Sequence, residues 1–248
     1  MSPPPLTISV VSHGQGSLAR RLLNDLSKQT GFKLIVTLNV PENESFLEGL
    51  PDAPVTIVRN SVAKGFGANH NAAFVRCDTP WFAVLNPDVR LLEDPFPSLI
   101  STASGLPNPG AVAPRILNQA GRSEDSVRVH PTPWSVAGRV FDRNIGRASV
   151  AGTSRFYWLA GMFLMFSSHA FRSVRGFDER FFLYYEDYDI CARLQRAGFQ
   201  IALDPHATAV HDAQRDSRRS FRHLKWHMGS LLRVWTSGVF WSSVFRRG

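Results

Sequence analysis

Five acidic residues gather in one aromatic-rich stretch of the sequence, residues 176–199, which reads GFDERFFLYYEDYDICARLQRAGF. Within it, Glu186 and Asp187 directly follow a pair of tyrosines. Aromatic neighbours partly remove a carboxylate from water, which raises its basicity toward what a general base needs. The same acids suit the first turn of a helix, and the spacing of Asp189 and Arg193 is that of a simple helical ion pair. The stretch therefore predicts either a catalytic carboxylate or an ordinary acidic helix start.

A further acidic residue, Asp88, lies in the short motif LNPDV, directly after an apolar run at residues 81–85. Hard divalent cations such as Mg²⁺ or Mn²⁺ prefer oxygen ligands, so Asp88 is a candidate metal ligand. Asn-Pro-Asp is also good turn chemistry, which needs no metal. His211 follows another short apolar run and is a candidate imidazole ligand. A single histidine in such a place is more often an ordinary surface residue.

A third candidate segment is rich in glycine and asparagine: residues 59–73, RNSVAKGFGANHNAA. Glycines such as Gly67 beside a helix start allow a ligand to approach the backbone closely, and Lys64 supplies positive charge for a phosphate. Asn60 and Asn69 add amide groups to the same stretch. The segment does not match a phosphate-binding P-loop, and a tight helix-entry loop is the alternative interpretation.

The elements that must position these residues alternate between strands and helices. Strand-like runs occupy residues 6–11, 33–39, 55–59 and 81–85, and helices are expected at residues 18–26, 67–76 and 186–197. This alternation predicts an α/β fold with a mainly parallel central sheet flanked by helices. Ligands bind such sheets beyond the carboxyl ends of the strands. Four polar residues follow predicted strands, namely His13, Asn39, Asn60 and Asp88.

The second half of the chain is less regular. Residues 118–155 are rich in Arg, Ser, Gly and Pro and are expected to form a mobile excursion on the acceptor side. Residues 156–168 are apolar and return to the core, and short strands are expected at 201–203 and 207–210.

Positive charge concentrates at the end of the sequence. The net charge is +8, and residues 215–248 hold eight basic residues and one acid, so this tail carries +7 of it. We therefore divide the chain into a domain at 1–214 and a basic tail at 215–248. Such a tail predicts an anionic partner: a membrane surface, a lipid-linked phosphate or nucleic acid. Its apolar residues predict a helical tail that lies in the headgroup plane of an anionic membrane or packs on the domain.

Composition indicates a soluble globular core, because 44% of the residues are hydrophobic and 19% are charged. Two cysteines without metal-ligand or disulfide-framework spacing favour a reducing compartment, so a cytoplasmic protein is expected. The sequence has no run of 18 or more apolar residues, so no membrane-spanning helix is predicted.

Taken in order, the motifs TISVVSHG, GFGANHNAA, LNPDV and GFDERFFLYYEDYDICARLQRAGF, and then His211, resemble the family 2 glycosyltransferases of the GT-A fold. The closest likeness is to their bacterial rhamnosyltransferase-like branch, and it spans about residues 6 to 212. The resemblance implies an inverting, metal-dependent hexosyltransferase that uses Mg²⁺ or Mn²⁺. It would move a sugar from a nucleotide-sugar, with dTDP-L-rhamnose as the suggested donor. The acceptor would be a hydroxyl of a saccharide or lipid-linked saccharide in the synthesis of cell-surface polysaccharide, lipopolysaccharide or another glycolipid.

The resemblance also assigns roles position by position. Asp187 matches the acid that deprotonates the acceptor hydroxyl, and Asp88 matches the last acid of the Asp-X-Asp motif, which binds metal and donor diphosphate. His211 matches a histidine that joins the metal or diphosphate site in some relatives. The donor side is expected to comprise His13, Asn39, Asn60, Lys64, Gly67, Asn69, Asn86 and Asp88. The acceptor side is expected to comprise Trp158, Tyr185 and Glu186.

Two departures from the family pattern bear on the expected chemistry. Asn86 stands where the first acid of Asp-X-Asp would be, and Asn39 stands where many members carry an acid that recognises the nucleotide base. A catalytically silent nucleotide-sugar-binding protein is therefore the alternative. A nucleic-acid partner is not expected, because the charge lies outside the core and no zinc or RNA-binding motif is present. The expected location is the cytoplasm, either free or peripheral on the cytoplasmic face of the inner membrane.

Overall fold

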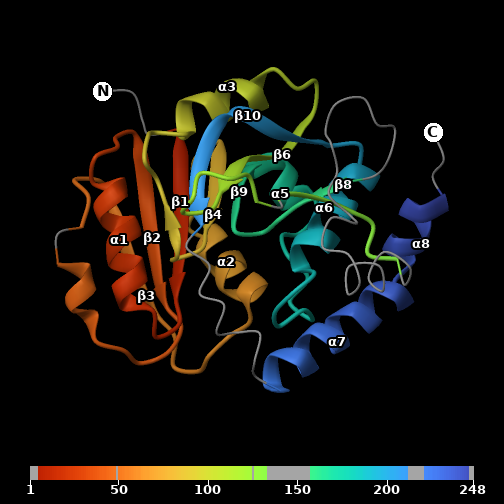
Figure 1. Cartoon of the computed structure of the whole chain (residues 1–248), viewed down its shortest axis with the longest axis horizontal. Helices are drawn as coiled ribbons and strands as arrows, with labels where there is room; N and C mark the ends of the chain where they lie inside the picture. Colours follow the sequence, from red (N-terminus) through yellow and green to blue (C-terminus); the bar gives the residue numbers. More distant parts are fainter. Residues whose placement is uncertain (1–4, 49, 125, 133–156, 212–220, 246–248) are drawn as a thin grey trace.

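A mixed, mostly parallel sheet runs through the centre of the molecule and carries helices on both faces (Figure 1). The computed structural model describes residues 5–48, 50–124, 126–132, 157–211 and 221–245. Much of the excursion expected at residues 118–155, from 133 onward, lies outside these described residues. Within them the sheet has eight strands in the order β3-β2-β1-β4-β9-β6-β10-β5.

The first half of the sheet confirms the predicted parallel strands. These are β1 (Leu6–Ser12), β2 (Phe32–Leu38), β3 (Val55–Arg59) and β4 (Trp81–Leu85). Pairs β1–β2, β2–β3 and β1–β4 are all parallel, so the strands end at one edge of the sheet. The residues that follow β1, β2 and β4 therefore meet at that edge.

The second half of the sheet contains strands that the sequence predicted only in part. They are β5 (Val89–Arg90), β6 (Pro109–Leu117), β9 (Phe163–Ser167) and β10 (Gln200–His211). Strand β9 is antiparallel to both β4 and β6, whereas β10 is parallel to β6 and antiparallel to β5. Separately, β7 (Val127–Val129) pairs with β8 (Tyr157–Leu159).

The two short strands predicted at 201–203 and 207–210 are both extended, but they are joined in one strand, β10, with a register shift between Asp204 and Thr208. The Asp204 carboxylate accepts hydrogen bonds from the backbone N–H groups of His206 and Ala207. The irregular stretch thus keeps its backbone groups bonded, and the strand continues to His211.

Two apolar cores lie on opposite faces of the sheet, and successive side chains of β4 point alternately into one core and the other. Phe82 and Val84 contribute to one core, and Ala83 and Leu85 contribute to the other. Helices α1 (Gly16–Leu26), η1 (Glu44–Leu47) and α3 (Phe96–Ser104) cover the Ala83 face. Helices α2 (Phe66–Phe74), α5 (Ser168–Ser173) and α6 (Glu186–Arg196) cover the Phe82 face.

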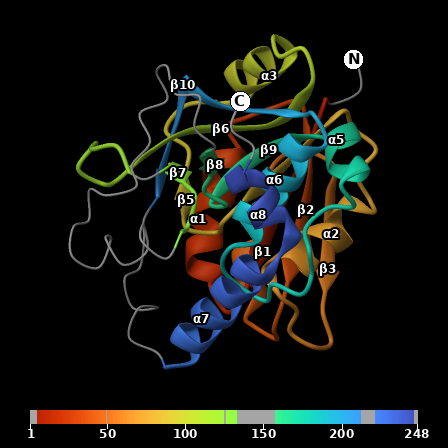
Figure 2. The ribbon, with the colours of Figure 1, turned by 90° about the vertical axis from the view of Figure 1, so that its right-hand side faces the viewer.

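The tail forms two helices, α7 (Phe221–Thr236) and α8 (Gly238–Phe245), which lie against the α6 side of the domain (Figures 1 and 2). Leu231, Val234 and Phe240 are each only 1% exposed and belong to the same core as α6. This is the packed arrangement that the sequence left open as an alternative. Among the described residues, no helix is long and apolar enough to cross a membrane.

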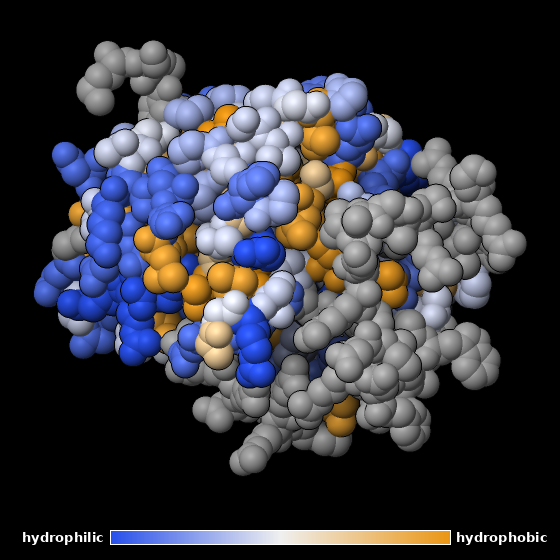
Figure 3. Space-filling model, turned by 45° about the horizontal axis from the view of Figure 1, so that its top comes forward, coloured by the Kyte–Doolittle hydropathy of each residue, from blue (hydrophilic) through white to orange (hydrophobic). Residues whose placement is uncertain are grey.

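Figure 3 shows the molecule with α3 turned toward the viewer. In this view, hydrophilic residues gather over the α1 side, and apolar residues lie nearer the centre. The α1 side thus presents a well-solvated surface.

Candidate active site

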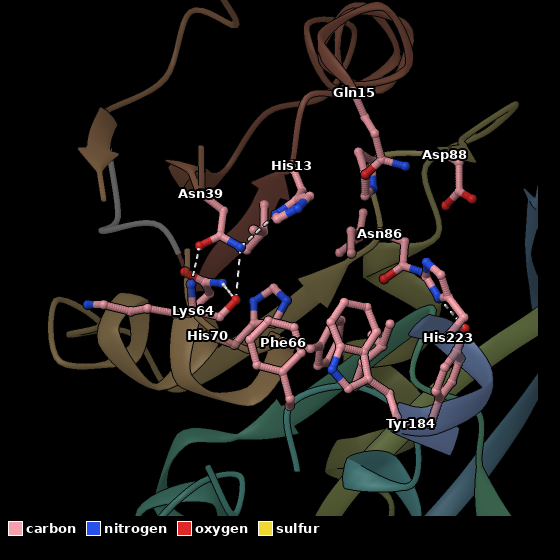
Figure 4. Close-up of a pocket in the computed structure, with 17 residues that line it drawn as sticks. His13, Gln15, Asn39, Lys64, Phe66, His70, Asn86, Asp88, Tyr184 and His223 are labelled. Atoms are coloured by element: carbon pink, nitrogen blue, oxygen red, sulfur yellow. Dashed lines mark hydrogen bonds between the residues drawn. The ribbon is translucent and has the colours of Figure 1, made fainter. Parts of the chain in front are cut away.

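A cavity of about 650 Å³ opens at the edge of the sheet where β1, β2 and β4 end. His13 and Gln15 line it from the loop after β1, and Asn39 lines it after β2 (Figure 4). Asn86 and Asp88 line it after β4. The expectation that polar residues after separate strands meet at one site is thus met at three positions: His13, Asn39 and Asp88.

The asparagines of the donor-side prediction form one hydrogen-bonded group. Asn60 Nδ2 donates to Asn39 Oδ1 at 2.9 Å and to Asn69 Oδ1 at 2.6 Å. Asn69 Nδ2 in turn donates to the backbone oxygens of Lys64 and Gly65, at 3.2 and 3.0 Å. Asn60 therefore supports the cavity wall from behind, while Asn39 and Asn69 line the cavity.

Two residues of the glycine-rich segment act differently from the roles expected for them. The side chain of Lys64 extends away from Asn86 and Asp88 in Figure 4, so its backbone, not its ammonium group, serves this part of the wall. A Cβ at Gly67 would lie 2.6 Å from the Cβ of Phe177. Glycine is needed there because α2 packs closely on Phe177, and a bound molecule is not what occupies that space.

Asp88 and His211 lie side by side, as the metal-site interpretation requires. His211 Nε2 is 3.2 Å from Asp88 Oδ2, and its Nδ1 is 3.5 Å from Oε2 of Glu124. Burial acts to lower the pKa of His211, but the hydrogen bond and charge of Asp88, with those of Glu124, raise it above its usual value. The three side chains come from the end of β4, the end of β10 and the turn after β6.

The side chains of Asp88 and His211 could hold a divalent cation. Asp88 Oδ1 is buried and has no hydrogen-bond partner among the described residues, and a carboxylate oxygen is the type of ligand that Mg²⁺ and Mn²⁺ prefer. The described residues contain no cluster of three His, Cys, Asp or Glu side chains placed for a metal. A cation held by Asp88 and His211 would therefore need further ligands from a bound molecule or water.

The acidic pair Glu186–Asp187 begins helix α6 and is buried, with 6% and 8% exposure. Asp187 Oδ2 accepts a hydrogen bond from Gly161 N, and Oδ1 accepts one from Tyr188 N, both at 2.9 Å. Burial raises the pKa of Asp187, an effect that the charge of Arg128 and these hydrogen bonds partly offset. Burial and the charge of Asp187 raise the pKa of Glu186 well above its ordinary value. Two carboxylates with raised pKa values are typical of sites that move protons.

The backbone just before this pair is held in an unusual conformation. Tyr184 and Tyr185 have φ angles of 74° and 65°, in the left-handed region that non-glycine residues rarely adopt. Each such residue costs about 1–3 kcal/mol and persists only where the surroundings enforce it. The kink turns Tyr184 into the cavity and starts α6 with its acids in the first turn.

Asp187 itself does not line the cavity, but the backbone of Gly161 and Met162 connects it to Asn86, which does. Gly161 N donates to Asp187, and the carbonyl of the next residue, Met162, accepts from Asn86 N at 2.9 Å. A Cβ at Gly161 would lie 3.1 Å from the Cβ of Asp187, so glycine lets the two backbones approach. The turn just before β9 thus joins the Asp187 site to the Asn86–Asp88 end of the cavity.

Trp158 and Tyr185, expected on the acceptor side, are buried near this carboxylate pair. Trp158 is 2% exposed and donates its indole N–H to the carbonyl of Val129. Tyr185 is 8% exposed, and its hydroxyl lies 3.4 Å from His227 Nε2. The guanidinium of Arg128 lies 5.1 Å from the Trp158 ring centroid. Trp158 and Tyr185 therefore contribute to the packing behind Asp187 and expose little surface of their own.

The tail supplies part of the cavity wall. His223 and Trp226 of α7 line it together with Phe182 and Tyr184. The ring centroids of Phe182 and Trp226 are 4.8 Å apart, and Tyr184 Oη lies 2.9 Å from His223 Nδ1. The tail helix α7 and the domain thus meet at this cavity.

Several residues of the site escaped sequence analysis. His70 lines the cavity from within GFGANHNAA, and burial lowers its pKa to about 3, so it is an uncharged part of the wall. Its position in that motif was an available signal. Glu124, His223 and Trp226 gave no local signal, because their partners are more than 40 residues away or in another element.

Comparison with known families gives a match to the model described as "Glycosyltransferase like family 2", over residues 3–229. Rhamnosyltransferase WbbL of Escherichia coli K12 is 28% identical over 242 residues, covering 91% of this chain and 90% of that protein. The N-acetylglucosaminyl-diphospho-decaprenol L-rhamnosyltransferase of Mycobacterium tuberculosis is 28% identical over 257 residues, covering 90% and 81%.

Solved structures with the same fold include a mannosyltransferase, PcManGT of Pyrobaculum calidifontis, in complex with GDP-Man and Mn²⁺. Its TM-score is 0.61 at 16% identity, and the match covers 94% of this chain and 65% of that one. S. aureus TarS 1-349 in complex with UDP gives a TM-score of 0.63 at 11% identity, covering 97% and 71%. At these identities the likeness establishes the fold alone, which is that of the GT-A glycosyltransferases.

Proposed function

The chain belongs to the glycosyltransferase family 2-like proteins, and from this premise we propose that it is an inverting transferase that uses a nucleotide-sugar. The observation that supports the proposal is that Asn86 and Asp88 line one cavity, that His211 pairs with Asp88, and that the buried carboxylate Asp187 is hydrogen-bonded to Gly161 nearby. The proposal assigns the donor side to the residues that line the cavity and the base to Asp187 behind it.

The donor's diphosphate would lie at the Asp88 end of the cavity. Asp88 and His211 are the residues that would hold Mg²⁺ or Mn²⁺ there, and such a cation would neutralise charge on the diphosphate as it leaves. Asn86, which lines the same end, offers an amide in place of the family's first carboxylate. Fewer charged ligands make a weaker metal site, so we propose that the protein needs the cation but binds it with moderate affinity.

Asp187 is proposed to act as the general base. Its carboxylate would take the proton of the acceptor hydroxyl while the hydroxyl oxygen forms a bond to the sugar's anomeric carbon. The bond from that carbon to the diphosphate oxygen breaks in the same step, and the nucleoside diphosphate leaves with its electrons. Attack opposite the leaving group inverts the anomeric configuration. A raised pKa, caused by burial, makes Asp187 a stronger base than an exposed aspartate.

For the sugar and the acceptor we propose L-rhamnose, delivered from dTDP-L-rhamnose, and a lipid-linked saccharide. Two relatives that cover most of this chain are named as rhamnosyltransferases, and one name contains a decaprenol-linked acceptor. The product would serve the synthesis of a cell-surface polysaccharide.

A lipid-linked acceptor agrees with the outer side of α7. Leu224, Met228 and Leu232 follow one another at helical spacing and are 56%, 53% and 61% exposed. Lys225 and Arg233 are exposed beside them. An apolar row flanked by cations suits the headgroup region of an anionic membrane. We propose that α7 docks there while its inner side, through His223 and Trp226, completes the cavity.

Incubation with dTDP-, UDP- and GDP-sugars and Mg²⁺ or Mn²⁺ tests the activity through release of the nucleoside diphosphate. A transferase slowly uses water as acceptor, so at least one donor should be consumed. Tight binding without release of any nucleoside diphosphate would instead favour the catalytically silent binding protein, to which the two asparagines, Asn39 and Asn86, gave weight.

A further inference from the structure

Helix α7 contacts each residue of the loop that leads into α6, residues 181–185. Ser230 Oγ donates a hydrogen bond to Leu183 O at 2.9 Å. The rings of Trp226 and Phe182 pack together, with centroids 4.8 Å apart and planes inclined by 30°. The helix thus holds both the backbone and the side chains of this loop.

The two tyrosines at the end of the loop both contact histidines of α7. Tyr184 Oη lies 2.9 Å from His223 Nδ1, and the two side chains are neighbours in Figure 4. The His227 ring packs edge-on against both tyrosines, with centroids 5.4 Å from Tyr184 and 5.2 Å from Tyr185. Tyr185 Oη also lies 3.4 Å from His227 Nε2.

One face of α7 makes all of these contacts. At its far end, the guanidinium of Arg233 lies 5.8 Å from the Phe181 ring centroid. The contacting residues recur every three or four positions, which places them along one side of a helix: His223, Trp226, His227, Ser230 and Arg233. The exposed row of Leu224, Met228 and Leu232 lies on another side of the same helix.

The loop that α7 contacts is the one with the strained backbone. Tyr184 and Tyr185 are both in the left-handed region, with φ angles of 74° and 65°. Such a conformation is unfavourable for a side chain with a Cβ, and it persists only where the surrounding structure enforces it. The contacts of α7 act on both strained residues and on Leu183 before them.

The strained kink sets where α6 and its acids begin. Tyr185 directly precedes α6, and its carbonyl accepts a helical hydrogen bond from Asp189 N at 3.0 Å. Asp187 follows two residues after Tyr185, and its carboxylate reaches Gly161 N at 2.9 Å. If the kink relaxed to ordinary φ angles, the chain would enter α6 in another direction and Asp187 would move relative to Gly161.

We propose that α7 stabilises the Tyr184–Tyr185 kink and thereby holds Asp187 in place for proton transfer, with His227 and Ser230 as positioning residues. This inference rests on the proposed function, which makes Asp187 the base. Neither His227 nor Ser230 lines the cavity. Their effect on turnover is therefore separable from an effect on donor binding.

The first test is hydrogen–deuterium exchange of the full-length protein without nucleotide, read by mass spectrometry, which does not depend on activity. The double variant His227→Leu/Ser230→Ala removes two of the polar contacts with the loop. Amides of residues 183–189 should exchange about tenfold faster in it, the effect of losing about one neutral hydrogen bond's worth of local stability. Unchanged exchange in this segment would overturn the proposal.

A matched control makes the same two exchanges away from α7. His206→Leu/Ser98→Ala alters an exposed histidine and a serine of α3 whose hydroxyl donates to Asp204 at 2.7 Å. Helix α3 and α7 pack on opposite faces of the sheet. This control should lower the melting temperature through the lost hydrogen bond but leave exchange at residues 183–189 as in the wild type.

The second test is release of the nucleoside diphosphate from dTDP-L-rhamnose, the proposed donor, with Mn²⁺. In His227→Leu/Ser230→Ala, kcat should fall about 10- to 100-fold, the cost of misplacing a reacting group by up to about 1 Å. The KM for the donor should stay within about 2-fold, because the cavity wall is unchanged. His227→Gln/Ser230→Thr keeps an N–H group and a hydroxyl and should recover much of kcat, and the control should keep all of it.

The outcomes separate the inference from the function on which it rests. If His227→Leu/Ser230→Ala turns over as fast as the wild type, the positioning role is wrong while the proposed function stands. A loss of kcat in the control as large as in this variant would also overturn the role, because loss of stability alone would then explain both. If the wild type releases no nucleoside diphosphate from dTDP-, UDP- or GDP-sugars, the proposed function is wrong and the positioning of a base falls with it.

Discussion

Replacement of Asp187 by Asn tests the proposed base most sharply. An amide cannot accept the acceptor's proton, and loss of a general base usually lowers turnover by roughly 10²–10⁴-fold. That corresponds to about 2.7–5.4 kcal/mol of transition-state stabilisation. Because Asp187 does not line the cavity, nucleotide binding should stay within about 3-fold of the wild type, less than one hydrogen bond is worth.

The same exchange also perturbs the fold, and the structure gives the size of that effect. Both Asp187 oxygens accept backbone N–H groups, from Gly161 and Tyr188. Asn has only one amide oxygen, so its NH₂ group would face one of these N–H groups. The lost hydrogen bond and the unpaired N–H should lower the free energy of unfolding by about 1–3 kcal/mol.

Asp189→Asn is the matched control for this loss of stability. Asp189 lies in the same helix at 6% exposure, and its carboxylate pairs with Arg193 at 2.7 Å. The variant should lose stability but keep turnover within a few-fold. Release of the nucleoside diphosphate at saturating donor, with thermal unfolding of each variant, measures both effects. The base role is refuted if Asp187→Asn keeps more than about a tenth of wild-type turnover, or if Asp189→Asn loses as much as Asp187→Asn.

Three further predictions follow from the site. In calorimetry, Mn²⁺ should strengthen UDP binding to the wild type about tenfold or more but hardly at all in Asp88→Asn; an unchanged metal effect would remove Asp88 as a ligand. Glu186 has a folded-state pKa raised above 4.5, so the stability that it contributes is present below that pH and lost as pH rises through the folded pKa. Glu186→Gln has no group that titrates there, so the unfolding free energy of the variant should rise relative to that of the wild type above pH 4.5. Denaturant titrations at several pH values measure this difference, and a difference that does not change with pH would contradict the raised pKa of Glu186. Finally, serine at Leu224, Met228 and Leu232 together should abolish flotation with anionic liposomes at low salt, while failure of the wild type to float would exclude membrane docking.

The sequence predicted the parts of the fold that are local and regular. The parallel strands β1 to β4 are each short and rich in apolar and β-branched residues, and Asp88 and Asn39 were recognisable because they follow such runs directly. The antiparallel strand β9 was read only as a buried segment, because a short apolar run does not reveal its direction or its partners.

The parts of the site that escaped prediction depend on contacts between distant residues. Glu124 reaches His211 only because β6 and β10 are neighbours in the sheet. Trp226 lines the cavity only because α7 folds back onto the domain, an outcome that its amphipathic sequence left open. The hydrogen bonds between Asn39 and the Lys64 backbone likewise depend on atomic positions that no pattern of residue types specifies.

The measurement that tests the central claim most directly is proton NMR of the sugar product during consumption of a nucleotide-sugar donor, with dTDP-L-rhamnose tried first. Spectra recorded before mutarotation report the anomeric configuration of the product. The account predicts release of the nucleoside diphosphate together with a product of inverted configuration. A product that retains the donor's configuration would contradict the single displacement through Asp187, and nucleotide-sugar binding without any consumption would contradict the enzyme itself.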